Sequence, residues 1–237
     1  MARAIQFRDA VAVAGTFPLL AGLDLDIDEG EVVHVRGPNG AGKTSLLRAC
    51  AGLLPISGGR AEVLGHDLAT DRREVRKHVG LLGHASFLYE DLSVEENVRF
   101  AVRASRGDVG RVDGALERLG LGGRLRGTPL ARLSTGQRRR AALAVVVARA
   151  PRLWLLDEPH AGLDDAGRDV LDGLVGEARR GGAAVVIASH EHDRAERLAG
   201  RVVWIAGGRI VAVPAGRAAD GAAQDSPGVE GAVASAR

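Results

Sequence analysis

Cysteine, aromatic residues and lysine are all scarce in this sequence of 237 residues. The single cysteine, Cys50, excludes a framework of internal disulfides. Aromatic side chains make up only 3% of the residues. No apolar run approaches the ~18 residues that a membrane-spanning helix needs, and the sequence contains no signal-peptide pattern at its start. These absences predict a cytosolic chain, so any membrane crossing would belong to other chains.

Neither sign of charge dominates the sequence. The formal net charge is +2, with 26% charged and 46% hydrophobic residues, which is ordinary for a soluble globular protein. So small an excess does not indicate nucleic-acid binding. The basic run 138–140 could suggest such a patch, but the solvent-exposed first turn of a helix explains it better. We therefore predict no nucleic-acid partner.

Lysine occurs only twice, at Lys43 and Lys77, although Lys and Arg together number 32. Lys43 lies in "GPNGAGKTSLL" (37–47), which fits the phosphate-loop pattern G-x-x-x-x-G-K-[ST] between a strand-like and a helix-like segment. Glycines let successive backbone N–H groups point at one anion. A compact ammonium group can lie between two phosphates, whereas the planar guanidinium group of arginine is larger. The segment therefore predicts a nucleotide-phosphate site.

Two adjacent carboxylates, Asp157 and Glu158, end the apolar segment "LWLLDEP". Ligands of α/β proteins bind at the carboxyl ends of parallel strands. The first carboxylate could hold Mg²⁺ together with Thr44, because Mg²⁺ prefers oxygen ligands. The second could orient or deprotonate an attacking water. The pair is a weak signal alone, but after a phosphate loop it predicts a hydrolytic site.

Three short apolar runs, at 31–36, 153–157 and 183–189, are typical of strands buried on both faces of a parallel sheet. The alternating N-terminal pattern predicts an antiparallel β flank, and 201–213 predicts a hairpin around Gly207 and Gly208. We therefore expect an α/β fold with a parallel sheet and an antiparallel flank.

The middle of the chain, about 84–150, is predicted to be a helical subdomain inserted into this fold. Its signals include a capping box at Ser93 and a uniformly apolar helix after the basic run. From 215 to 237 the sequence loses its periodicity and predicts a disordered tail. The predicted domain accordingly spans residues 1–214.

A further motif, "LSTGQ" (133–137), precedes the apolar helix. With the two sites above, it makes the sequence resemble the ATP-binding cassette (ABC) family over about residues 3–213. Gly37–Thr44 resembles that family's Walker A motif, Leu153–Glu158 its Walker B motif and Leu133–Gln137 its signature loop, with Thr135 where Gly is commoner. "AGLD" (161–164) resembles its D-loop, and His190 its switch histidine.

The resemblance implies a P-loop NTPase fold that binds ATP and Mg²⁺. Two cassettes, either two copies of this chain or this chain and a related ATPase, would pair head to tail around two ATP molecules. Catalysis would involve Glu158, His190 and Lys43, and Mg²⁺ would be held by Thr44 and Asp157. The expected ATP-binding residues are Gly37, Pro38, Asn39, Gly40, Ala41, Gly42, Lys43, Thr44 and Ser45. The residues expected to contact the partner's ATP are Ser134, Thr135, Gly136, Gln137 and Asp164.

Two positions depart from the family pattern. His84 stands where the family usually has a glutamine, and an imidazole is a poorer Mg²⁺ ligand than an amide oxygen. We hypothesise that His84 still faces the nucleotide and acts through a water. The aromatic residue that often stacks on adenine is missing near Val13 and Ala14, so Phe17 is the candidate replacement.

The resemblance also implies transmembrane permease subunits, and thus a cytoplasmic chain peripheral to the inner face of the cell membrane. A groove around 84–100 would receive a helix of such a subunit. The segments "GHASFLYEDLSVEENVRF" and "LWLLDEPHAGLD" resemble the ATP-binding subunits of haem exporters of cytochrome c maturation. Export of a drug, lipid or peptide, a non-transport ABC ATPase and a regulator without turnover are the alternatives. The intact Glu158 argues against the last.

Overall fold

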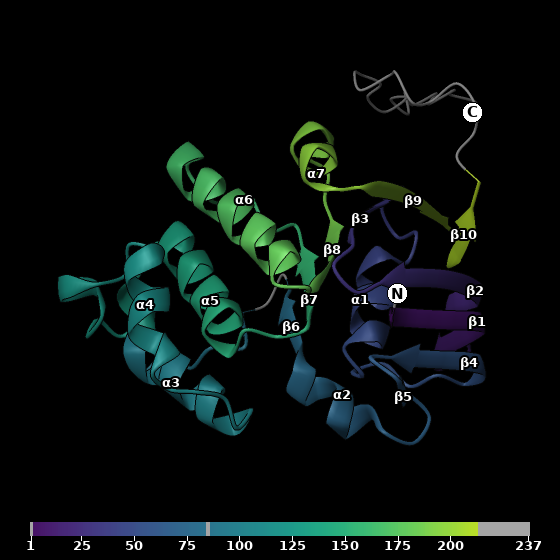
Figure 1. Ribbon diagram of the computed structural model, residues 1–237, viewed down its shortest axis with the longest axis horizontal. Coiled ribbons are helices and arrows are strands. Elements are labelled where there is room, and N and C mark those ends of the chain that lie inside the picture. Colours follow the sequence, from purple (N-terminus) through teal and green to yellow (C-terminus); the bar gives the residue numbers. More distant parts are fainter. Residues whose placement is uncertain (1, 84–85, 213–237) are drawn as a thin grey trace, which may run out of the picture.

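Two β-sheets and the helices around them form the protein in this computed structural model, which describes residues 2–83 and 86–212 (Figure 1). The larger sheet has the strand order β10-β9-β3-β8-β7-β6 and the smaller one β2-β1-β4-β5. The strands of the larger sheet are β3 (Val32–Arg36), β6 (Val79–Leu82), β7 (Leu153–Asp157), β8 (Ala184–Ala188), β9 (Arg201–Ala206) and β10 (Arg209–Val211). Those of the smaller sheet are β1 (Arg3–Ala14), β2 (Phe17–Asp28), β4 (Gly58–Val63) and β5 (His66–Asp67).

The pairing in both sheets agrees with the sequence-based expectation. All neighbours in the larger sheet are parallel except β10, which forms an antiparallel hairpin with β9 around Gly207 and Gly208. The smaller sheet is antiparallel throughout. The predicted α/β class, with a parallel sheet and an antiparallel flank, is confirmed.

The central strands are buried on both faces because two hydrophobic cores flank the larger sheet. In β7, Leu153 and Leu155 face the core shared with the smaller sheet, while Trp154 and Leu156 face the helices on the other side. Because successive residues face different cores and both cores are apolar, consecutive positions of such a strand are occupied by apolar residues. Helix α1 (Lys43–Cys50) contacts strands of both sheets, so the phosphate loop that precedes it has a rigid support on both sides.

Most of the helices cover the second core. They are α3 (Val94–Ala104), α4 (Arg111–Arg118), α5 (Thr135–Arg149), α6 (Asp165–Arg180) and α7 (His192–Leu198). Helix α2 (Arg72–His78) instead buries Val75 in the first core. Two short 3₁₀ helices are η1 (Gly123–Leu125) and η2 (Leu130–Arg132). Helix α3 begins with the predicted capping box, in which Ser93 and Glu96 bond each other's backbone N–H groups. Helix α5 packs against α3 and α4, and most of its second half is buried, as its apolar sequence predicts.

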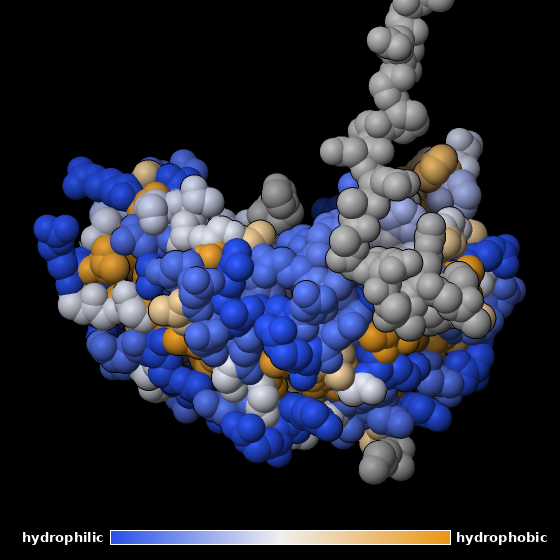
Figure 2. Space-filling view, turned by 90° about the horizontal axis from the view of Figure 1, so that it is seen from above, coloured by the Kyte–Doolittle hydropathy of each residue, from blue (hydrophilic) through white to orange (hydrophobic). Residues whose placement is uncertain are grey.

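The surface visible in Figure 2 is mainly hydrophilic, and apolar side chains form only small separate patches on that face. No helix within residues 2–83 and 86–212 has the length and apolar character needed to span a bilayer. The predicted tail, 215–237, lies outside the described residues.

Candidate active site

The phosphate loop connects β3 to α1, and close backbone contacts fix its path. A Cβ atom on Gly37 would lie 2.1 Å from the carbonyl oxygen of Ile205, so no larger residue fits. Gly42, with a φ of 110°, precedes the first residue of α1 in a conformation that strongly favours glycine. Gly208 donates its N–H to the carbonyl of Ala41 at 2.9 Å. The loop is thus anchored by the β9–β10 hairpin.

Lys43 is nearly buried and lies across its own loop. Its Nζ donates to the carbonyl oxygens of Gly37 at 2.6 Å and Pro38 at 3.1 Å. Burial lowers the pKa of the ammonium group, whereas the nearby carboxylates of Glu158 and Asp157 act in the opposite direction. The ammonium group is therefore positioned beside an anion site that the helix N-terminus and the loop amides also favour.

Asp157 joins the phosphate loop to the end of β7. Its Oδ2 accepts a 2.7 Å hydrogen bond from Oγ1 of Thr44, and the carboxylate is buried. A hydroxyl and a carboxylate oxygen, together with phosphate and water, match the oxygen donors that Mg²⁺ prefers. The donor set predicted from the sequence is therefore close together and chemically suited to this ion.

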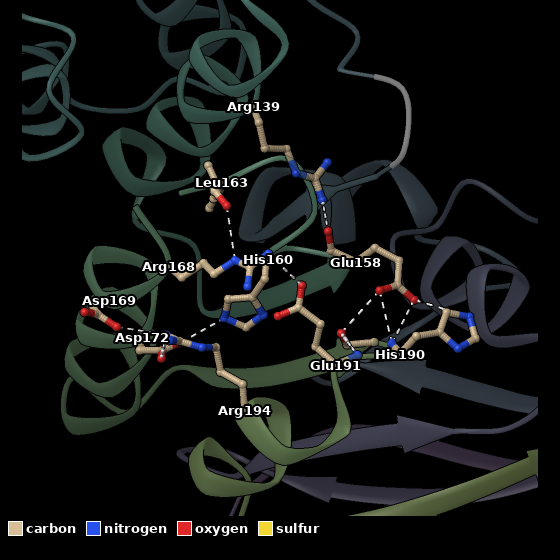
Figure 3. Close-up of polar contacts among 11 residues, drawn as sticks. Arg139, Glu158, His160, Leu163, Arg168, Asp169, Asp172, His190, Glu191 and Arg194 are labelled. Carbon is tan, nitrogen blue, oxygen red and sulfur yellow. Dashed lines mark hydrogen bonds and ion pairs between the residues drawn. The ribbon is translucent and has the colours of Figure 1, made fainter. Parts of the chain in front are cut away.

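Glu158 is held against the residue predicted as the switch histidine (Figure 3). Its two carboxylate oxygens accept the backbone N–H of His190 at 3.1 Å each, and Nε2 of His190 lies 3.6 Å from Oε1. The backbone of Glu158 has a φ of 46°, a left-handed conformation that is rare outside glycine. A non-glycine residue in this conformation marks a strained position that neighbouring contacts must hold in place.

Ser189 and His34 stabilise the segment that carries His190, and the sequence analysis did not identify either of them. The hydroxyl of Ser189 donates to Glu158 Oε2 at 3.2 Å. His34, fully buried on β3, places Nε2 3.2 Å from the carbonyl oxygen of Ser189. Burial lowers the pKa of His34 to about 4, so the ring is neutral at pH 7 and must donate through Nε2 to this acceptor. The sequence did contain one indication of His34, because it is a polar residue within the otherwise apolar run of β3.

A cleft of about 740 Å³ brings the predicted groups together. It is lined by the loop from Asn39 to Ser45, the two carboxylates at the end of β7, and His190. Phe17 lines the same cleft and is 69% exposed, so its ring is accessible to a ligand there. The volume is within the range typical of small-molecule sites.

The predicted partner-contact residues begin two helices. Ser134 accepts the N–H of Gln137 at 3.2 Å, and the Gln137 side chain accepts the N–H of Ser134 at 3.0 Å, forming a capping box. The Ser134 hydroxyl hydrogen remains available to donate. Asp164 caps α6 by accepting the N–H of Gly167 at 2.9 Å. Gly136 packs so closely on the carbonyl of Gly162 that an added Cβ would lie 2.8 Å from that oxygen.

The basic run 138–140 differs from the prediction at its central residue. Arg139 is partly buried and donates to the carbonyl oxygens of Gly83, Asp157 and Glu158 at 2.6 to 2.7 Å. The prediction of a solvent-exposed first turn is therefore wrong for Arg139, because helical periodicity turns this side chain toward the end of β7. The predicted residue His84 lies outside the described residues.

The fold and the cleft define a P-loop nucleoside triphosphatase: a parallel sheet, a glycine-rich loop closing on a helix, and a carboxylate pair beside it. The family comparison is more specific. The family model described as "ABC transporter" matches residues 20–161. The chain therefore belongs to the ABC transporter family, as its ATP-binding ATPase subunit.

Similar proteins of known name agree with this assignment. The Bordetella bronchiseptica protein named cytochrome c biogenesis ATP-binding export protein CcmA is 45% identical over 171 residues, which are 71% of this chain and 75% of that protein. The daunorubicin resistance ATP-binding protein DrrA3 of Streptomyces coeruleorubidus is 39% identical over 201 residues, covering 81% of this chain and 62% of that protein.

The fold also matches a solved structure. A dimeric structure of the ATP-binding cassette MJ0796, described as a post-hydrolysis state bound to ADP and Pi, superposes with a TM-score of 0.77 at 23% identity. The match covers 87% of this chain and 96% of that one, and it confirms the ABC-type fold.

Proposed function

We propose that ATP is bound along the cleft with its phosphates on the loop from Gly37 to Ser45 and its adenine against Phe17. Lys43 then exchanges its two carbonyl partners for phosphate oxygens. Three features support this arrangement: the loop amides, the helix N-terminus and the ammonium group all favour an anion at one point. Phe17 is the exposed aromatic side chain that lines the cleft.

Glu158 acts as the general base in this proposal. It accepts a proton from a water that attacks the γ-phosphorus, while the bond to the bridging oxygen breaks and releases ADP. His190 donates to the γ-phosphate and positions the water. The bonds from Ser189 and from the His190 amide to Glu158 are the observation that carries the proposal, because they aim base and switch histidine at one point.

Thr44 and Asp157 would hold Mg²⁺, which would supply neutralisation of charge on the triphosphate. In the described structure the hydroxyl and the carboxylate bond each other at 2.7 Å, so both oxygens are already at one place. The buried position of Asp157 limits competing hydration of that carboxylate.

A second cassette completes the site. Two copies, or one copy and a related ATPase, pair head to tail, so that the start of α5 in one subunit faces the γ-phosphate held by Lys43 of the other. Ser134, Thr135, Gly136 and Gln137 then contact that phosphate, and Asp164 lies near it. The exposed Ser134 hydroxyl and the basic first turn of α5 support this, as does the dimer formed by MJ0796.

Permease subunits bind this chain at the inner face of the cell membrane. A groove of about 280 Å³, lined mainly by apolar residues that include Leu53, Leu81, Phe87 and Leu88, lies between the sheet and α3 and fits an apolar helix. Phe87 and Leu53 are 71% and 45% exposed. Exposed apolar groups of this kind indicate a protein contact.

The exported substrate is haem for cytochrome c maturation. The 45% identity to the Bordetella export protein of cytochrome c biogenesis supports this, together with the sequence resemblance around 83–100. Drug export is the second candidate, because the daunorubicin resistance protein is 39% identical over a larger share of this chain.

A deletion strain separates the two candidates. Loss of covalently haem-stained c-type cytochromes with unchanged drug sensitivity is expected for the haem exporter. Normal cytochromes with increased daunorubicin sensitivity would favour drug export.

The ATPase chemistry is tested with Glu158→Gln, which should stop phosphate release and shift the protein to the size of a dimer when Mg·ATP is added. Unchanged phosphate release would contradict the role of Glu158.

A further inference from the structure

Arg139 connects three parts of the protein through one guanidinium group, and Figure 3 shows its contact with Glu158. One terminal nitrogen donates to the carbonyl of Gly83, just after β6, at 2.6 Å. The other donates to the carbonyls of Asp157 at 2.7 Å and Glu158 at 2.6 Å, at the end of β7. Arg139 itself is the fifth residue of α5. Its neighbour Arg138 donates instead to the carbonyls of Leu133 and Ala131 in the loop before α5.

Burial of this guanidinium group carries a desolvation cost. Burial lowers the pKa of the guanidinium group, which means that the folded protein disfavours its charge. Its Nε is buried and has no hydrogen-bond partner within residues 2–83 and 86–212. The three carbonyl acceptors and the nearby carboxylates of Asp157 and Glu158 offset this cost, so the cation depends on the end of β7 keeping its place.

The contact with Glu158 gives Arg139 a role. Glu158 has the left-handed φ of 46°, and three hydrogen bonds hold its backbone. Its N–H donates to the carbonyl of Ala188 at 2.8 Å, and its carbonyl accepts from Arg139 at 2.6 Å and from the N–H of Ala161 at 3.2 Å. These bonds fix the peptide groups on both sides of the Cα atom. The direction of the Glu158 side chain toward His190 depends on this backbone geometry.

We propose that Arg139 is a positioning residue for ATP hydrolysis, which holds Glu158 in its hydrolytic geometry and ties that geometry to the placement of α5. The inference rests on the proposed role of Glu158 as general base. Because α5 begins with the predicted signature loop, any shift of this helix is transmitted through Arg139 to the base. Among the described residues no hydrogen bond joins Arg139 to the phosphate loop, so its loss should affect the chemical step more than ATP binding.

The test compares steady-state ATP hydrolysis by the full-length wild type, Arg139→Met and Arg139→Lys. The methionine variant keeps an unbranched side chain like the aliphatic part of arginine, and it loses all the N–H donors. A misplaced base can lower the rate about a hundredfold, so we expect kcat to fall by about that factor while KM for ATP stays near the wild-type value. The lysine variant keeps a cation with three donors, and it should recover part of the lost kcat.

Arg149, which also lies on α5, provides the matched control. Burial lowers the pKa of its guanidinium group as well, and it donates to the backbone carbonyl of Arg76 at 2.9 Å. Arg149→Met should keep kcat near wild type. Binding of a fluorescent ATP analogue and the melting temperature show that each variant is folded. If Arg139→Met does not fold, Arg139→Gln replaces it in the same comparison.

The inference is overturned if Arg139→Met hydrolyses ATP at the wild-type rate. A loss no greater than that of Arg149→Met, or a loss confined to KM, overturns it as well. Absence of phosphate release by the wild type is a different result, which counts against the proposed function.

Discussion

Thr44 and Asp157 are 113 positions apart in the sequence, and a 2.7 Å hydrogen bond joins their side chains. The bond connects the first turn of α1 to the end of β7, and thus the predicted phosphate site to the predicted hydrolytic site. The two oxygens proposed as Mg²⁺ ligands therefore already lie side by side.

We expect the Thr44 hydroxyl to set the requirement for Mg²⁺. Thr44→Val removes the oxygen but keeps the branched shape, and we expect the Mg²⁺ concentration for half-maximal ATPase activity to increase by about tenfold or more. Thr44→Ser keeps the hydroxyl and should remain close to wild type. Titration of ATPase activity with Mg²⁺ measures this. Equal Mg²⁺ requirements in the two variants would show that the hydroxyl is not a ligand.

We expect Lys43 to contribute to ATP binding through its charge and its shape. Lys43→Ala should weaken ATP binding by about 10- to 100-fold, the effect of losing a charge-assisted hydrogen bond. Lys77 is the ideal control because it is the other lysine of the chain and forms an ion pair with Glu74 on the surface of α2. Lys77→Ala should leave binding unchanged. Isothermal titration calorimetry with ATP compares the two variants directly.

His34 makes the stability of the protein depend on pH. The unfolded chain binds a proton at this residue near the ordinary pKa of 6.5, whereas the folded protein does so only near pH 4. The free energy of unfolding therefore decreases as pH falls through this window, by about 3 kcal/mol at most for this residue. His34→Gln retains a donor for the Ser189 carbonyl and cannot titrate.

We expect urea unfolding of His34→Gln to show a smaller loss of stability between pH 6.5 and 4.5 than the wild type shows. Burial lowers the pKa of His78 and His192 too, so part of the pH dependence remains in the variant. Identical pH dependence in variant and wild type would contradict the assignment to His34.

An ion-pair network stabilises the helical region at low ionic strength. Glu95 accepts hydrogen bonds from Arg126 and Arg99, which lower its pKa to about 2, and Arg126 also pairs with Asp113 on α4. Because the folded pKa is depressed, the stabilisation is complete above about pH 4.5 and is lost as pH falls toward 2.

Glu95→Gln should lower the melting temperature at pH 7 by about 1–4 °C, and less at 1 M salt. Arg111→Met is the control, since Arg111 reaches Asp108 only at 4.0 Å on an exposed surface. Differential scanning fluorimetry at two salt concentrations distinguishes the variants. A salt-independent difference would point to lost packing and not to charge.

The sequence predicted those parts of the fold and site in which short segments determine local structure. The phosphate loop, the buried strands and the capping box at Ser93 depend on neighbouring residues, and the structure contains all three. The cleft also unites Lys43, Asp157 and Glu158, as expected from strand ends at one sheet edge. Their catalytic and binding roles remain predictions.

Other features depend on contacts between distant segments. The Arg139 side chain reaches carbonyls 18 and 56 residues away, and His34 reaches Ser189 155 residues away. Neither spacing forms a local pattern. The left-handed backbone of Glu158 likewise has no sequence signature, because a glutamate in that conformation is stabilised by its surroundings and not by its own preference.

The β9–β10 hairpin has a consequence for synthesis on the ribosome. It supplies the Ile205 and Gly208 backbone groups that fit against the phosphate loop, although the loop itself is translated about 160 residues earlier. A nascent chain that ends before this hairpin lacks one wall of the nucleotide cleft. ATP can thus stabilise the chain only near the completion of translation, and it cannot assist the earlier folding of the N-terminal strands.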